Sequence, residues 1–400
     1  MTEAIYPPVS NSQKAWTFVS VSVLLSNYYF LYFVDFHQGL ANAGFLFSFM
    51  KIIGVVLICS VFLSASICLK YTIEAVVLIF FLLFSILIYV LKSIEIGVSD
   101  AMYFNGVFCL APFLLLRFGA DLNRVRFFFE CCVVIIAMQI LLDLIIYMAG
   151  YSLWENKAFI GGLGNPSSFG FVCNVLMCYV LFERKSGASS VLFFLALAYG
   201  VYMTSSMLAL LLLAFVITYW VFSKVTISRV LLGIICVSLG VLFVSSFWGG
   251  HVQYKLASIA GLVTGEKDAQ SLSVSLRVQN IFEYIGNFSG SPVAGLFYGF
   301  TERSYYGYDS QYLTYASSFG AFLSLLFCLA IIVLYFRLRH ESKWYFLSVI
   351  VLLFGIAFSV NRFMDYYPLP IFLAVILCVH RELVRQRNAG RWVAADAPGT

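Results

Sequence analysis

The sequence predicts an all-α polytopic membrane protein with about twelve transmembrane helices and one large outer loop. Of its 400 residues, 62% are apolar and only 11% are charged, too few charged side chains to cover a soluble domain of this size. Apolar runs of about 20 residues, the length at which a helix crosses a bilayer, recur from one end of the chain to the other. The lipid bilayer is therefore the expected partner, and the net charge of +5 does not indicate nucleic acid.

We expect residues 1–400 to form a single integral membrane domain. The N-terminus lacks the basic start and the small-residue cleavage site of a signal peptide, so the first apolar segment is expected to remain as a span. The predicted spans are 15–34, 45–69, 72–91, 101–118, 127–149, 166–182, 189–203, 205–222, 229–247, 316–336, 344–361 and 366–383.

The division of residues 189–222 into two spans needs its own justification. As one helix this stretch would be about 50 Å long, whereas the hydrocarbon core of a bilayer is about 30 Å thick. Gly200 and the Thr204-Ser205-Ser206 cluster offer a place for the chain to turn. Two short spans are the better interpretation, and a single broken or strongly tilted helix is the alternative.

The cations support this topology. Sixteen of the 24 Lys and Arg residues lie on one predicted side of the membrane, and the positive-inside rule makes that side cytoplasmic, with both termini on it. A single span over 189–222 would place the later basic loops on the opposite side from the earlier ones. The sixteen are Lys14, Lys70, Arg117, Arg124, Arg126, Arg184, Lys185, Lys224, Arg229, Arg337, Arg339, Lys343, Arg381, Arg385, Arg387 and Arg391.

The outer side has one long loop, residues 248–315, between predicted spans 9 and 10. Loops of this length are usually functional or disordered. Within it, "LRVQNIFEYI" places Leu276, Ile281, Phe282 and Ile285 on one helical face, which predicts an ordered surface helix.

This loop holds the residues best suited to chemistry. Arg277 and Arg303 can hold a diphosphate through paired, charge-assisted hydrogen bonds. Asp309 or Glu283 can accept a proton from a sugar hydroxyl. The simpler interpretation of each such charge, taken alone, is that it is solvated. Asp309 differs because it closely precedes an apolar span.

Tyrosines surround Asp309 at positions 305, 306, 308, 312 and 315. Tyrosines are common at any membrane interface, and they also form platforms for sugar rings, so the cluster leaves both interpretations open. Tyr308, Gln311 and Tyr312 are our candidates for substrate contacts here. Gly295-x-x-x-Gly299, earlier in the loop, suggests a turn that lets the backbone approach a substrate.

Three positions outside the loop complete the candidates. Arg362, in the short outer loop "SVNRFMDYYPLP", either binds substrate, snorkels to the interface or pairs with Asp365. Asn165-Pro166 is explained as the start of a helix with proline at its first position. Asp143 is a carboxylate within a span, which is a functional hypothesis by default, although its place near the outer end also lets it reach the interface.

No Cys or His spacing is typical of a metal site, and the long loop contains no cysteine. The cytoplasmic segments contain no Gly-rich nucleotide-binding loop. We therefore expect no metal and no cofactor.

The order of these motifs resembles that of the O-antigen polymerase/ligase superfamily. "GGLGNPSSFG" is similar to that family's Asn-Pro helix start, and "SLRVQNIFEYIGNFSGSPVAGLFYGF" is similar to its loop arginine followed by P-x-x-G-x-x-x-G. "YDSQYLTYASSFGAFLSLLF" is similar to its Asp/His motif leading into the next helix. The similarity covers roughly residues 155–335. The family's Ser-Arg pair is replaced here by Thr204-Ser205-Ser206, so no arginine role transfers to that place.

The resemblance implies a polysaccharide polymerase of the Wzy type, with a GT-C-like architecture, in a bacterial inner membrane. Such enzymes join undecaprenyl-diphosphate-linked repeat units on the periplasmic face without metal or nucleotide, in some cases with a chain-length regulator as partner. The family's arginine corresponds to Arg277 and its Asp/His position to Asp309, with Glu283 as a second candidate base. Arg303, Arg362 and Asn165 are candidates for substrate binding.

Two other functions stay open at this point. O-antigen ligases usually place histidine where this chain has Asp309, and the only histidine in the long loop, His251, lies at its beginning. A lipid-linked oligosaccharide flippase also commonly has about twelve spans, but it should show two related halves and charges along a path through the membrane. Here the charges concentrate in one outer loop.

Overall fold

We analysed a computed structural model of the chain, in which every regular element of the described residues is helical. The described residues are 9–29, 43–63, 73–96, 122–151, 153–154, 157–184, 187–223, 272–300, 311–338, 343–344, 347–348, 350–351 and 369–376. Predicted spans 101–118 and 229–247 lie outside them, as does most of 344–361 and 366–383.

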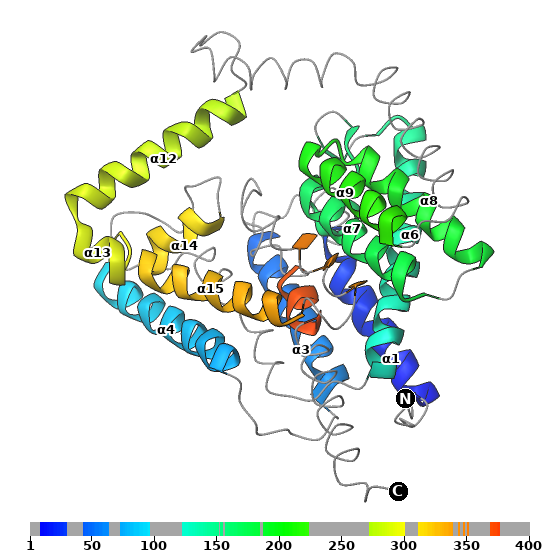
Figure 1. Cartoon of the computed structure of the whole chain (residues 1–400), viewed down its shortest axis with the longest axis horizontal. Coiled ribbons are helices and arrows are strands. Elements are labelled where there is room, and N and C mark those ends of the chain that lie inside the picture. The colour runs from blue at the N-terminus through cyan, green and yellow to red at the C-terminus, as the bar shows by residue number, and fades with distance from the viewer. Residues whose placement is uncertain are drawn as a thin grey trace, which may run out of the picture.

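The helices form two neighbouring groups (Figure 1). The first group contains α1 (Asn11–Leu25), α3 (Ala43–Leu63), α6 (Leu122–Met148), α7 (Pro166–Phe182), α8 (Ala188–Met203) and α9 (Met207–Ser223), with the short 3₁₀ turn η3 (Gly161–Leu163). The second contains α4 (Ile73–Ile96), α12 (Leu272–Gly290), α13 (Pro292–Phe297), α14 (Gln311–Phe319) and α15 (Ala321–Leu338).

Aromatic side chains build the core of each group. In the second group, Phe81 of α4 stacks on Phe327 of α15 with their ring centroids 4.7 Å apart. In the first, Phe129 of α6 lies 5.4 Å from the ring of Tyr179 on α7 and 4.8 Å from that of Trp344. All of these side chains are almost completely buried. Large buried rings contribute most of the apolar area in such a core.

The centre of the first group is α7. Pro166 is its first residue, and the helix packs against α6, α8, α9 and η3. A Cβ atom on Gly170 would lie 2.6 Å from the Cβ of Ala209, so only glycine allows α7 and α9 to approach this closely. The Asn174 amide secures the contact by donating to the carbonyl oxygens of Gly170 (3.0 Å) and Ala209 (2.9 Å).

The predicted division of residues 189–222 is confirmed as two helices. α8 ends at Met203 and α9 begins at Met207. Between them, Ser205 has a left-handed φ of +57°, which breaks the helical path. The hydroxyl of Thr204 donates to the Val201 carbonyl at 2.6 Å and accepts from the Ser206 N–H at 3.3 Å. The polar cluster that suggested a turn thus makes the hydrogen bonds of that turn.

Two predicted helix boundaries are wrong. The span predicted at 15–34 is interrupted at Ser26, where α1 ends. The span predicted at 316–336 is interrupted at Gly320, which separates α14 from α15 and has a φ of +97°. Both breaks are caused by tertiary contacts, described below, that hydropathy does not reveal.

Within the described ranges, one helical segment, Asn123–Met148, is both long and apolar enough to cross a membrane. Six shorter apolar segments of 10–17 residues accompany it. An all-helical chain with many apolar helices is compatible with a helical membrane protein.

Candidate functional site at the predicted outer ends of the helices

The nine candidate residues fall into two sets. Asp309, Arg303, Tyr308 and Arg362 lie outside the described residues, and their roles stay predictions. The others lie in or beside described helices: Arg277 and Glu283 in α12, Gln311 and Tyr312 at the start of α14, and Asn165 directly before α7.

Asn165 caps α7, as its sequence context indicated. Its backbone is extended, its side-chain oxygen accepts from the Ser168 N–H at 3.1 Å, and Pro166 follows at the first helical position. The explanation of Asn165-Pro166 as a helix start is therefore confirmed. A contact between Asn165 and substrate stays a prediction.

Asp143 is 4% exposed and accepts hydrogen bonds on both carboxylate oxygens. The Tyr29 hydroxyl donates to Oδ1. The backbone N–H groups of Ile160 and Gly161 donate to Oδ2 at 3.0 and 2.9 Å. A buried carboxylate needs hydrogen-bond donors, and the backbone N–H groups of the turn need an acceptor. Asp143 and the turn satisfy each other in this way. We call Asp143, Gln139 and their partners the aspartate lock.

Gln139, one helical turn before Asp143, extends the lock. Its side-chain carbonyl accepts from the Gly162 N–H at 3.0 Å, and its amide donates to the Leu25 carbonyl at 2.8 Å and to the Ser26 hydroxyl at 3.1 Å. A Cβ on Gly162 would lie 2.0 Å from the Leu25 oxygen, so the turn needs glycine there. The break at the end of α1 thus leaves the Leu25 carbonyl accessible to Gln139.

A small hollow lies beside the lock, lined in part by Asp143, Tyr147, Tyr151 and Lys157. Its free volume of about 10 Å³ is roughly that of one water molecule. The Lys157 ammonium lies 5.5 Å from the centre of the Tyr147 ring. In the described arrangement Asp143 holds η3 in place through the Ile160 and Gly161 N–H groups.

A second buried charge, Lys92, lies near the end of α4 and is 2% exposed. Its ammonium donates to the carbonyl oxygens of Ser318 at 2.9 Å and Phe300 at 3.3 Å. It also lies 5.0 Å from the centre of the Tyr298 ring. Ser318 is close to the C-terminus of α14, where the helix dipole favours a cation. We call this group the lysine clamp.

Two glycines make the lysine clamp possible. A Cβ on Gly299 (φ +79°) would lie 2.3 Å from the Ser317 oxygen, and one on Gly320 (φ +97°) would lie 2.6 Å from the Leu296 oxygen. The Phe300 N–H donates to the Ser317 carbonyl at 2.7 Å. The Gly299 turn lies against the backbone of α14, and an approach of this turn to substrate stays a prediction.

The clamp therefore fixes the residue that precedes segment 301–310 and the helix that follows it. That segment contains Arg303, Tyr308 and Asp309. Sequence reasoning missed Lys92, because a lysine at the end of an apolar helix usually snorkels to the interface. The residues after Lys92, Ser93-Ile94-Glu95-Ile96, alternate between polar and apolar and gave no signal of a buried role.

The two tyrosines near Asp309 that the structure describes are a core residue and a site candidate. Tyr315 is buried and packs against Phe81, with ring centroids 5.8 Å apart, so it belongs to the core. Tyr312 is partly exposed, and burial raises the pKa of its hydroxyl, with a smaller contribution from Cys328. Of these two, only Tyr312 has an accessible surface for a sugar.

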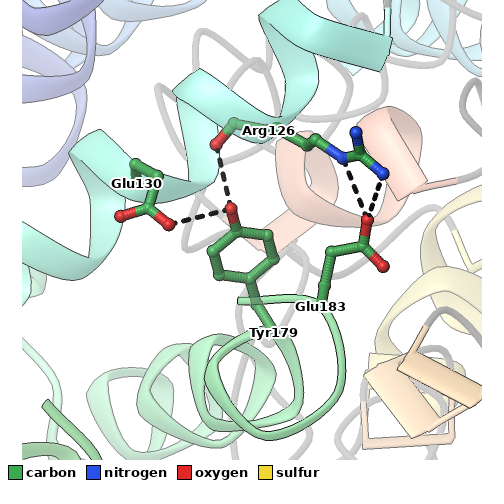
Figure 2. Close-up of polar contacts among 4 residues, drawn as sticks. All are labelled: Arg126, Glu130, Tyr179 and Glu183. Carbon is green, nitrogen blue, oxygen red and sulfur yellow. Dashed lines mark hydrogen bonds and ion pairs between the residues drawn. The ribbon is translucent and has the colours of Figure 1, made fainter. Parts of the chain in front are cut away.

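The predicted cytoplasmic end of α7 has a different kind of polar cluster (Figure 2). Arg126 pairs with Glu183 at 2.7 Å, and the Tyr179 hydroxyl donates to Glu130 at 3.0 Å. Arg184 completes the group at 3.2 Å from Glu130. These contacts join the start of α6 to the end of α7, about 25 Å along the helix from Asn165. They stabilise the helix pair and do not contribute to the outer site.

Within the described ranges, no group of His, Cys, Asp and Glu side chains could hold a metal ion. In comparisons with known proteins, no family model and no curated protein matches this sequence.

Proposed function

We propose that this protein is a polysaccharide polymerase of the inner membrane that joins polyprenyl-diphosphate-linked repeat units on the periplasmic face. In this proposal it has about twelve spans, a GT-C-like architecture, both termini in the cytoplasm and residues 248–315 as its periplasmic loop. The observation that carries the proposal is the order Arg277, Pro292-x-x-Gly295-x-x-x-Gly299, Asp309 within one outer loop.

The described helices support a site at this place. α12 carries Arg277 and Glu283, and α13 and the Gly299 turn follow within a few residues. The lysine clamp then anchors Phe300, directly before the segment that contains Asp309. A rigid support of this kind lets a loop hold reacting groups in a defined geometry.

The proposed reaction is a displacement at the sugar carbon bound to diphosphate. A hydroxyl of the acceptor repeat unit attacks this carbon, the carbon–oxygen bond to the diphosphate breaks, and polyprenyl diphosphate leaves with the bonding electrons. Arg277, with Arg303 or Arg362, binds the diphosphate and stabilises its departure. Asp309, or Glu283, accepts the proton of the hydroxyl. The diphosphate leaving group drives transfer, so the proposal needs neither nucleotide nor metal.

Purified protein in vesicles, supplied with polyprenyl-diphosphate-linked repeat units, tests this function. The wild type should produce a ladder of polymer sizes. Asp309→Asn and Arg277→Ala should each lower the initial rate about 100-fold or more, the usual effect of losing a proton acceptor or a charge-stabilising group. Lys267→Met, a loop charge without an assigned role, is the matched control and should keep the wild-type rate.

Three results would contradict the proposal in different ways. If both variants make near-wild-type polymer, the assigned roles are wrong although the activity stands. If the wild type makes no polymer but moves the glycan lipid between leaflets, the protein is a transporter. Transfer of glycan only to a lipid A–core acceptor would identify a ligase.

A further inference from the structure

In the part of α12 whose side chains are described, residues 279–290, large apolar side chains lie on the exposed face. The half-buried face is mainly polar, with Asn280, Glu283 and Asn287 beside the rings of Tyr284 and Phe288. The exposed face carries Ile281, Phe282 and Ile285, and the side chain of Phe282 is 69% exposed. A helix on the surface of a water-soluble region shows the opposite pattern, with apolar residues inward. The outward face of α12 is therefore suited to an apolar surrounding.

The same apolar surface continues onto α13 and α15. On α13, Val293 is 72% and Phe297 is 54% exposed. The ring of Phe297 lies 5.9 Å from that of Phe322 on α15. Leu325 and Leu329, one and two turns further along α15, are also exposed. The exposed apolar side chains of α13 and α15 thus adjoin, and α13 directly follows α12. We call the exposed apolar side chains of these three helices the apolar strip.

Charge is absent from the described outward part of α12 and α13. Between Gln279 and Phe297 the only charged residue is Glu283, which is on the half-buried face. A docking site for a charged protein or for nucleic acid would carry complementary charge. Lipid acyl chains need none.

The position of α12 fits this surrounding. Figure 1 shows α12 at the periphery of the molecule, connected through α13 to the end of the α4–α15 pair. Both α4 and α15 expose large apolar side chains along their length, among them Phe80 and Leu83 of α4. Such helices present these faces to lipid when they are in a bilayer. The strip carries that lipid-facing surface onto α12.

We propose that α12 and α13 lie in the outer leaflet of the membrane, with the apolar strip in contact with acyl chains. Glu283, Tyr284 and Asn287 then face the rest of the protein from the level of the membrane surface. Amphipathic helices bind in this way, with their apolar face buried at the boundary between headgroups and acyl chains. This inference concerns a lipid contact and does not depend on the proposed reaction.

Photo-crosslinking tests the lipid contact directly. A benzophenone amino acid replaces Phe282 or Ile285 in the full-length protein, which is reconstituted in vesicles of phosphatidylethanolamine and phosphatidylglycerol. After irradiation, intact mass measurement should show phospholipid adducts at both positions. Leu329 on α15 is the positive control. Ser12, an exposed residue in the first turn of α1, is the control for a position in contact with water.

The expected result is an adduct yield at Phe282 and Ile285 within about 3-fold of that at Leu329, and at least 10-fold above that at Ser12. Size-exclusion chromatography of each variant verifies that it is folded before irradiation. Absence of phospholipid adducts at both positions, with adducts present at Leu329, would overturn the inference. Crosslinking to a second copy of the chain in place of lipid would overturn it as well.

Discussion

The aspartate lock and the lysine clamp each bury a titratable side chain near the predicted outer end of a helix, an acid in one case and a base in the other. Asp143 accepts two backbone N–H groups from Ile160 and Gly161, whereas Lys92 donates to two backbone carbonyls, of Phe300 and Ser318. In both cases a buried side chain forms hydrogen bonds with backbone groups that lie in a turn or at a helix end.

The two sites differ in where their partners lie along the chain. Ile160 and Gly161 follow Asp143 by 17 and 18 residues. Phe300 and Ser318 follow Lys92 by 208 and 226 residues. The lock therefore joins a nearby loop to α6 and, through Tyr29, Leu25 and Ser26, also reaches the α1 region, 113–114 residues earlier in the chain. The clamp holds Phe300, directly before the segment that contains Asp309, and this position makes it the more relevant element for the proposed site.

The largest expected effect comes from Asp143→Ala. This change leaves the Ile160 and Gly161 N–H groups without their buried acceptor, and the Tyr29 hydroxyl loses Asp143 and keeps the Gln139 carbonyl at 3.3 Å. We expect a loss of about 3–5 kcal/mol in the free energy of unfolding, measured on the protein in detergent. Asp143→Asn keeps one acceptor oxygen and the shape of the side chain, so it should lose clearly less. Equal losses would show that the lock does not depend on acceptor number.

Gly299→Ala tests how closely the backbones in the clamp must approach. The added Cβ would lie 2.3 Å from a backbone oxygen at a residue with positive φ. Strain and overpacking together should cost about 2–4 kcal/mol of unfolding free energy. The control is Gly286→Ala in α12, where a Cβ meets nothing within 4 Å. It should stabilise the helix by about 0.5–1 kcal/mol. A neutral Gly299→Ala would contradict the close approach.

Lys92→Met tests the clamp charge at nearly constant side-chain length. Two carbonyls each lose one donor, while the cost of burying an ammonium also disappears. We expect a net loss of about 1–3 kcal/mol, below that of Asp143→Ala. The exposed Lys157→Met should change stability by no more than about 0.5 kcal/mol. A larger loss for Lys92→Met than for Asp143→Ala would reverse the comparison. Thermal unfolding midpoints of the four proteins give the ranking.

The smallest effect is expected for Glu183→Gln at the predicted cytoplasmic end. The Arg126 and Glu183 side chains are 57% and 22% exposed, so water screens their attraction. The change should cost less than about 1 kcal/mol, and less still at high salt. Measuring unfolding at low and high salt checks this. A loss comparable to that of Lys92→Met would mean that the exposure of the charged groups does not determine how much each cluster stabilises the protein.

The sequence predicted the elements of the fold better than their interruptions. Hydropathy located α6 and α7, turn chemistry located the break between α8 and α9, and periodicity located α12. The breaks at Ser26 and Gly320 were missed, because each is caused by a partner distant in sequence, Gln139 for one and Leu296 for the other. Hydropathy averages over such positions and cannot detect these contacts.

The candidate site was predictable in part. Asp143 was recognisable because a carboxylate within a span is costly, although its partners were not. Lys92 was missed because a lysine at the end of an apolar helix usually extends its ammonium to the membrane interface, so its position did not suggest burial. Tyr315 was assigned to the tyrosine cluster from its position alone, and packing against Phe81 places it in the core. Proximity in sequence did not separate a core ring from a surface ring.

Deletion of the gene tests the central claim most directly, through the lipopolysaccharide of the cell that carries it. A polymerase acts after one repeat unit is assembled and before transfer to lipid A–core. The account predicts that deletion leaves lipopolysaccharide with a single repeat unit, and that wild-type protein, but not Asp309→Asn, restores the ladder. Lipopolysaccharide without any repeat unit after deletion would contradict a polymerase and indicate a ligase or a flippase.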